Sequence, residues 1–152
     1  MGRLPSVALL PVRVYLGVAL FFAGFSKVRK GFSDGKQVAE ITRKWLADGT
    51  PYDFFEPFLR DAVLPHPALF AWLVAWGELL GGACLALGLL TRPAAFGTVA
   101  LTTAICLAGG EVFWQAGTAP AFLAMSLAAL VSGGRFAGVD ARLQGKLPRF
   151  LV

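Results

Sequence analysis

The sequence predicts an all-α membrane protein, a bundle of four transmembrane helices with an amphipathic interfacial loop between the first and second helices. Apolar residues make up 57% of the 152-residue chain, against about 45–50% in soluble domains. Charged residues make up 15%, against roughly 25%. A single domain over residues 1–152 has too little interior to hide so much apolar surface from water. Lipid must therefore cover part of the chain, and we expect the lipid bilayer to be one of its partners.

Four apolar stretches predict the four spans, because a helix needs about 20 residues to cross the hydrocarbon core of a bilayer. These stretches cover residues 7–25, 68–90, 94–108 and 116–131. Each is expected to be helical, since lipid offers no partner to backbone N–H and C=O groups. The third and fourth stretches are short, so we expect these two helices to tilt or the bilayer to become thinner around them. Arg92 and Pro93 separate the second stretch from the third, which predicts an antiparallel hairpin.

The loop over residues 26–67 contains two amphipathic segments. Ser33 or Asp34 can cap a first helix, which Gly49 ends. Residues 53–61 repeat the alternation of apolar and charged side chains. Such segments either lie in the membrane interface or cover the end of the bundle, and the sequence leaves both interpretations open.

An even number of spans places both ends of the chain on one face of the membrane. We call this face, which also carries the turn at Arg92, side A, and the face of the 26–67 loop side B. Cations concentrate near the C-terminus, at Arg135, Arg142, Lys146 and Arg149. The positive-inside rule then favours cytoplasmic N- and C-termini. The composition is typical of a bacterial protein, so the expected location is the inner membrane.

Several classes of partner and cofactor are excluded. The net charge of +5 comes from cations in separate patches between apolar spans, and without a single basic face nucleic acid is not expected to bind. Cys84 and Cys106 differ in depth by roughly 9 Å, too far for a disulfide. His66 is the only histidine, so no metal site is expected, and no motif for a covalently bound cofactor is present.

The candidate intramembrane polar site consists of Glu78, Lys27 and Arg13. Ionisable groups inside a span are costly, which makes each a functional candidate. Glu78 lies roughly 18 Å from side A, and Arg13 only about 6–9 Å. Because side chains lean towards the N-terminus of their helix, we expect Lys27 to pair with Glu78, and Arg13 to receive Asp140 or carbonyl groups near the C-terminus. The pair then either locks the bundle or handles a proton or a ligand.

Small residues favour close helix packing around these groups. Gly17 and Gly24 share a face with Arg13 and Lys27, and Gly82 shares one with Glu78. A GxxxG spacing beside that face predicts that another backbone comes close. The supporting residues are Gly17, Gly24, Gly77, Gly81, Gly82, Arg92 and Asp140.

The tryptophans favour an interfacial position. Trp45, Trp72 and Trp114 all map near side B, as in the aromatic belts of membrane proteins. An aromatic pocket for a quinone or a lipid is the alternative interpretation.

Three motifs resemble the DoxX/DoxD family of small bacterial membrane proteins. They are the stripe over residues 13–27, the segment over residues 77–92 that includes Gly-Glu-Leu-Leu-Gly-Gly, and the closing turn over residues 133–140. The resemblance implies a four-helix membrane bundle. Some members are subunits of thiosulfate:quinone oxidoreductase, and others are linked to membrane redox or stress complexes. Histidine and other polar residues that some members carry in the third helix are not apparent here, so no catalytic residue is carried over.

These observations predict a small integral-membrane subunit of a quinone-linked redox assembly. Such a subunit binds quinone or partner proteins, which are other membrane redox subunits or further copies of the chain. One alternative is a non-catalytic membrane assembly or stability factor, and another is a small transporter. The sequence shows no nucleophile–base set, phosphate loop or cofactor motif, so the chain is at most a subunit of an oxidoreductase.

Overall fold

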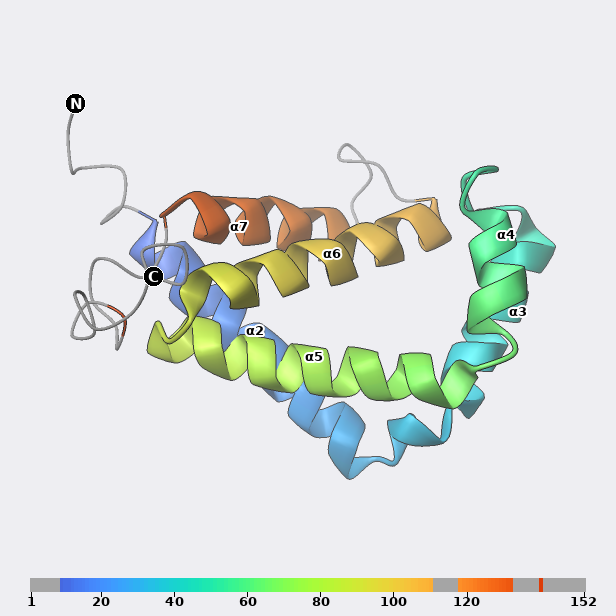
Figure 1. The fold of residues 1–152 in the computed structure, drawn as a ribbon, viewed down its shortest axis with the longest axis horizontal. Helices are drawn as coiled ribbons and strands as arrows, with labels where there is room; N and C mark the ends of the chain where they lie inside the picture. Colours follow the sequence, from blue (N-terminus) through green and yellow to red (C-terminus); the bar gives the residue numbers. More distant parts are fainter. Residues whose placement is uncertain (1–8, 111–117, 133–139, 141–152) are drawn as a thin grey trace.

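The fold is all-helical, as predicted. The computed structural model describes residues 9–110, 118–132 and 140, which contain helices and turns and no strand. The helices, in chain order, are α2 (Leu10–Arg29), α3 (Lys36–Asp48), α4 (Glu56–Phe58), α5 (Pro67–Leu87), α6 (Thr91–Gly109) and α7 (Thr118–Ser132) (Figure 1). A 3₁₀ turn over Phe32–Asp34 precedes α3, and a π-helical turn over Leu59–Val63 follows α4.

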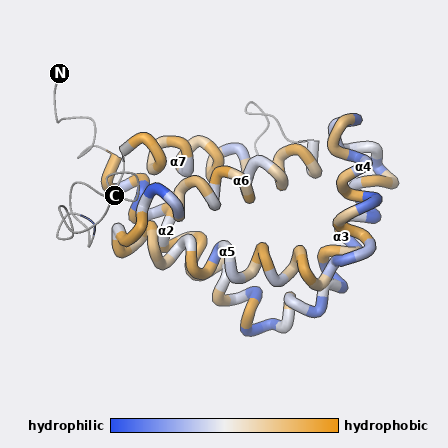
Figure 2. The backbone as a smooth tube through the Cα atoms, viewed as in Figure 1, coloured by the Kyte–Doolittle hydropathy of each residue, from blue (hydrophilic) through white to orange (hydrophobic). Residues whose placement is uncertain are grey.

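Within the described residues, three helices are long and apolar enough to cross a membrane. They are α2, α5 and α6, with 20, 21 and 19 residues, whereas α7 is a shorter apolar helix of 15 residues. Apolar residues cover most of α5, α6 and α7, and hydrophilic residues gather in α3 and around it (Figure 2). The third apolar stretch was expected to begin at Ala94, but α6 begins three residues earlier, because the first turn of a helix tolerates Pro93.

The closest helix packing joins α2 to α5, which run antiparallel. Added at Gly17, a Cβ atom would collide with the backbone of Ala86. Added at Gly82, it would collide with the backbone of Phe21. The prediction for Gly17, Gly24 and Gly82 is therefore confirmed: these residues let the two backbones approach.

The prediction of a close backbone approach at the GxxxG pair is wrong. Gly77 and Gly81 face α6, not α2, and no backbone lies against them. A Cβ on Gly77 would be 4.0 Å from Leu101 Cδ2, and one on Gly81 would be 3.3 Å from Thr98 Cγ2. The GxxxG spacing places two glycines on one face of α5, but it does not determine which neighbouring helix packs against that face.

The interior of the bundle is apolar at the level between its two ends. Side chains from α2, α5, α6 and α7 meet there, namely Leu16, Leu20, Leu85, Ala95 and Ala129. Each of these five is at most 2% exposed. This cluster is the shared core of α2, α5, α6 and α7.

The segment from α3 to the π-helical turn lies across one end of α5 and α6 (Figure 1). Its apolar side chains pack against both helices in a second cluster, whose buried members are Val38, Leu59, Val63, Ala71 and Ala108. The N–H of Tyr52 donates a hydrogen bond to the C=O of Leu107 at 3.2 Å, which satisfies a carbonyl at the end of α6. These contacts favour the interpretation that the segment covers the bundle end.

The cap of α3 differs in detail from the prediction. Gly35, with φ of 79°, precedes the helix, and its conformation is one that glycine adopts readily. The carboxylate of Asp34 still accepts a hydrogen bond from the N–H of Lys36 at 3.0 Å. Gly49 ends the helix with φ of 64°, as expected.

Candidate intramembrane site

Lys27 and Glu78 form a part-buried ion pair, as their depth predicts. The ammonium nitrogen of Lys27 lies 2.5 Å from both Oε1 and Oε2 of Glu78. The side chain of Glu78 is 7% exposed and that of Lys27 is 30% exposed. The pair is thus open on the lysine side and closed around the carboxylate.

The antiparallel packing of α2 and α5 brings these two side chains together. Gly24 lies against the backbone of Leu79, one residue beyond Glu78, so the helices are in contact at this level. Lys27 stands in the last turn of α2 and leans back along it, while Glu78 leans towards the start of α5. The ring of Phe32, whose centroid is 5.6 Å from the Lys27 ammonium, adds a cation–π contact.

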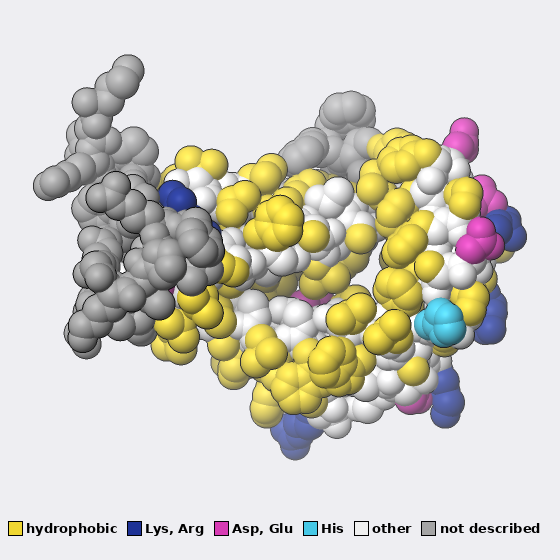
Figure 3. Space-filling view, in the orientation of Figure 1, with side chains coloured by type: hydrophobic (Ala, Val, Ile, Leu, Met, Phe, Trp, Pro, Cys, Tyr) yellow, Lys and Arg dark blue, Asp and Glu magenta, His cyan; other side chains and the backbone are white. Residues whose placement is uncertain are grey.

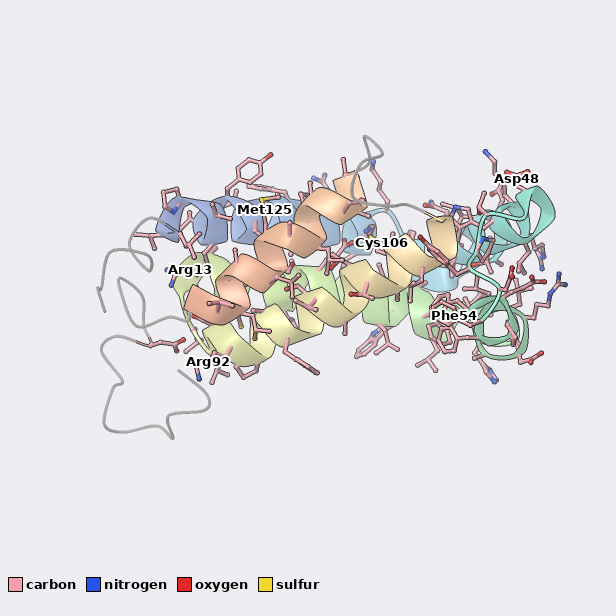
Figure 4. All side chains as sticks on the ribbon, turned by 90° about the horizontal axis from the view of Figure 1, so that it is seen from above. Arg13, Asp48, Phe54, Arg92, Cys106 and Met125 are labelled. Carbon is pink, nitrogen blue, oxygen red and sulfur yellow. The ribbon has the colours of Figure 1, made fainter. Side chains whose placement is uncertain are left out.

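Arg13 does not join this pair and belongs to a second polar cluster. Arg13 and Arg92 lie at one end of the bundle, and Phe54 and Asp48 lie at the opposite end (Figure 4). Arg13 is 3% exposed and interacts electrostatically with Asp140, the partner expected from its depth. The three predicted site residues therefore divide between two places.

Asp140 caps the start of α6 from a distant part of the sequence. Its carboxylate accepts hydrogen bonds from the N–H groups of Leu90 at 2.8 Å and Thr91 at 2.9 Å. Its own N–H donates to the C=O of Gly88 at 2.8 Å. Leu90 has φ of 47°, a strained conformation for a leucine, which these bonds help to hold. Asp140 is completely buried, so its role is to fix the turn between α5 and α6.

Sequence reasoning missed a set of buried hydroxyls in the bundle. Thr98 and Thr102 of α6 and Ser126 of α7 are at most 3% exposed. Each donates to a carbonyl of its own helix, for example Thr102 to Thr98 at 2.7 Å. The spacing of the two threonines by four residues within an apolar span was the available signal, because it places both on one helix face.

The remaining predicted residues are placed as follows. Arg92 is the second residue of α6, and no hydrogen-bond partner for its buried Nε lies among the described residues. Trp45 and Trp72 both belong to the side B half of the molecule, and Trp72 is 51% exposed. Several residues lie outside the described part of the chain: Trp114, Arg135, Arg142, Lys146, Arg149 and the closing turn before Asp140.

The surface between α5 and α6 is hollowed near the α3–α4 end. Apolar side chains surround this hollow, and an acidic side chain is visible in its floor (Figure 3).

A comparison with protein families identifies a family for this chain. The family model described as DoxX matches residues 8–111, which include α2, α5 and α6 with Lys27 and Glu78. No curated protein matches the chain. No solved structure matches it either.

Proposed function

Because the chain belongs to the DoxX family, we propose that it is a small membrane subunit of a quinone-linked redox assembly of the thiosulfate:quinone oxidoreductase type. The observation that carries the proposal is the Lys27–Glu78 ion pair between two apolar helices, with a nitrogen–oxygen distance of 2.5 Å and a carboxylate side chain that is only 7% exposed. Two charges in such a place are costly. A purely structural bundle would be served by apolar side chains, whereas this pair offers a donor and an acceptor to a ligand or a partner.

The proposed architecture has four spans in the bacterial inner membrane, with α7 as the fourth. Both ends of the chain face the cytoplasm, and residues 26–67 lie at the opposite interface. Two observations support α7 as a span: it packs against α6 and α2, and Val131 near its end is 80% exposed, as suits a lipid-facing residue. Its 15 residues require tilt or a locally thin bilayer.

The donor set at the ion pair fits the head of a quinone. A bound quinone would supply an acceptor of two electrons and two protons. The Lys27 ammonium carries three N–H donors, so it can hold Glu78 and also donate to a carbonyl oxygen. The Glu78 carboxylate can hold a proton at Oε1 or Oε2.

The proposal predicts that Glu78 is needed for electron transfer. We expect Glu78→Gln to lower thiosulfate- or quinol-dependent electron transfer in isolated membranes by roughly a hundredfold, the usual loss when a proton-handling group is removed. Glu56→Gln is the matched control, since Glu56 is 40% exposed and pairs with Arg60 on the surface. That variant should keep full activity.

Two outcomes would overturn the proposal. One is a Glu78→Gln variant that transfers electrons as well as Glu56→Gln at equal protein levels. The other is a deletion that leaves electron transfer unchanged. If the deletion instead lowers the amounts of other membrane proteins, the chain is an assembly or stability factor.

A further inference from the structure

The segment between α3 and α5 carries aromatic side chains on its surface. We call the exposed residues Tyr52, Phe54 and Phe58 the aromatic edge; Phe54 is 71% exposed. The inward-facing side chains of the same segment, such as Leu59 and Val63, are already buried in the second apolar cluster. Apolar surface of this kind marks a contact with another protein or with a membrane.

The aromatic edge is continuous with the surface of a spanning helix. The ring centroids of Phe54 and Phe55 lie 6.3 Å apart, and those of Phe55 and Phe58 lie 5.1 Å apart. The ring of Phe58 in turn meets that of Phe70, in the first turn of α5, at 5.6 Å. Apolar residues are also exposed beside Phe70 on α5, namely Leu69, Trp72 and Leu73. One apolar surface therefore extends from α5 to Phe54.

The aromatic edge is held at the level where α5 begins and α6 ends. The hydrogen bond from the N–H of Tyr52 to the C=O of Leu107 ties it to the last turn of α6. Phe54 lies beside the ends of the spanning helices, whereas Asp48 lies on the outer side of the segment (Figure 4). In a bilayer that α5 and α6 cross, the aromatic edge would thus face lipid and Asp48 would face water.

The charges of the segment favour contact with acyl chains over attraction to anionic headgroups. Residues 36–63 contain four basic and five acidic side chains, whereas recognition of anionic lipid depends on clusters of basic residues. Beside the aromatic edge, the carboxylate of Glu56 accepts a hydrogen bond from Nε of Arg60 at 2.7 Å. This pairing lowers the cost of bringing either charge close to lipid.

We propose that the aromatic edge inserts among the lipid acyl chains of the leaflet on side B and anchors the α3–α4 segment to the bilayer. Apolar faces of interfacial helices lie about 5–10 Å into the boundary between headgroups and acyl chains. The segment then covers the bundle end and also lies in the membrane interface. This anchoring requires that α5 and α6 cross the bilayer, and it is independent of the proposed redox role.

The test is the depth of single spin labels in vesicles of phosphatidylcholine, measured by power saturation. Phe54→Cys and Asp48→Cys are labelled in a Cys84→Ala, Cys106→Ala background. We expect the label at position 54 to collide more often with oxygen than with a water-soluble nickel chelate, at a depth of about 5–10 Å. The label at position 48 should collide mainly with the chelate. Phe96→Cys, at an exposed residue of α6, is the reference on a spanning helix.

Two further measurements separate the aromatic contact from other causes. Phe58→Cys leaves Phe54 in place, and its label should report the same preference for oxygen. Adding phosphatidylglycerol to the vesicles should leave the depth at position 54 unchanged, because the segment carries no excess of basic residues. Melting temperatures establish that each labelled variant is folded.

Three results would overturn the anchor. The first is a chelate-accessible label at positions 54 and 58, as at position 48. The second is a label that neither reagent reaches, because a second copy of the chain or another protein would then cover the aromatic edge. The third is insertion only in the presence of phosphatidylglycerol. Electron transfer by Glu78→Gln membranes tests the proposed function separately, so either proposal can fail without the other.

Discussion

The Lys27–Glu78 pair is stable in apolar surroundings because the charge of each side chain compensates the charge of the other. A single carboxylate at this depth would cost several kcal/mol or take up a proton. The 2.5 Å distances from one ammonium to two oxygens give the pair good geometry. Lys27 keeps 30% of its side chain exposed, so its long stem reaches the carboxylate from near the end of α2.

At the residue scale we predict that losing Lys27 alone harms the protein more than losing both charges. Lys27→Met strands a buried carboxylate, at a cost of about 2–3 kcal/mol, below the roughly 3–5 kcal/mol of a fully buried pair. The melting temperature in detergent should therefore fall, and adding Glu78→Gln should recover part of the loss. Arg13→Met with Glu78→Gln is the control. Rescue in that combination instead would show that Arg13 is the partner.

Asp140 has a different structural role from the Lys27–Glu78 pair. It accepts from two N–H groups at the start of α6 and neutralises Arg13 across the bundle. An anion at this position also suits the positive end of the helix dipole. The two polar centres thus have different structural roles: Asp140 fixes the turn before α6, and the Lys27–Glu78 pair joins α2 to α5.

At the scale of the helices, small residues decide which pairs come close. The α2–α5 contact depends on Gly17, Gly24 and Gly82, where a single added methyl group would meet backbone. Backbone atoms cannot turn aside as a flexible side chain can, so the helices would have to separate. The α5–α6 contact is looser, because Gly77 faces only the end of a leucine side chain.

The contrast between two glycines of α5 gives a prediction. Gly82→Ala should lower the free energy of unfolding by about 1–3 kcal/mol, as overpacking does. Gly77→Ala should change it by less than about 0.5 kcal/mol, as expected where nothing is displaced. Thermal melts of both variants in the same detergent measure the difference. Equal melting temperatures would mean that α2 and α5 are not in close contact.

At the scale of the whole molecule, the two ends of the helix bundle carry different structures. Arg13 and Arg92 lie at one end (Figure 4), where Asp140 accepts hydrogen bonds from the N–H groups at the start of α6. The α3–α4 segment covers the other end, and an apolar core lies between the two. The Lys27–Glu78 pair lies on the side of the core that faces α3. Its exposed lysine therefore connects it to side B.

The proposed four-span topology predicts the sides from which single cysteines react. In a Cys84→Ala, Cys106→Ala background, a cysteine at position 2 or 152 should react with a membrane-impermeant thiol reagent from the cytoplasmic face. Positions 2 and 152 lie outside the described residues. A cysteine at the exposed Asp48 should react from the opposite face. Labelling of positions 2 and 152 from opposite faces would require an odd number of spans.

Much of the architecture could be predicted from the sequence because it depends on local rules. Runs of apolar residues must be helical in lipid, and Gly49 ended α3 where expected. The partner of Glu78 also followed from local geometry, since rise per residue and side-chain lean fix depth without knowledge of neighbours. This geometry was enough to predict that Lys27 and Glu78 pair.

Helix rotation and long-range capping were decided only by the tertiary structure. The sequence gives the faces of a helix but not which neighbour each face meets, so Gly77 and Gly81 were assigned to a close contact that Gly17, Gly24 and Gly82 make instead. The bonds from Asp140 to Leu90 and Thr91 join residues about fifty positions apart, and no local pattern specifies them. The hollow between α5 and α6 likewise exists only once these two helices are placed, because it is the space that their packing leaves empty (Figure 3).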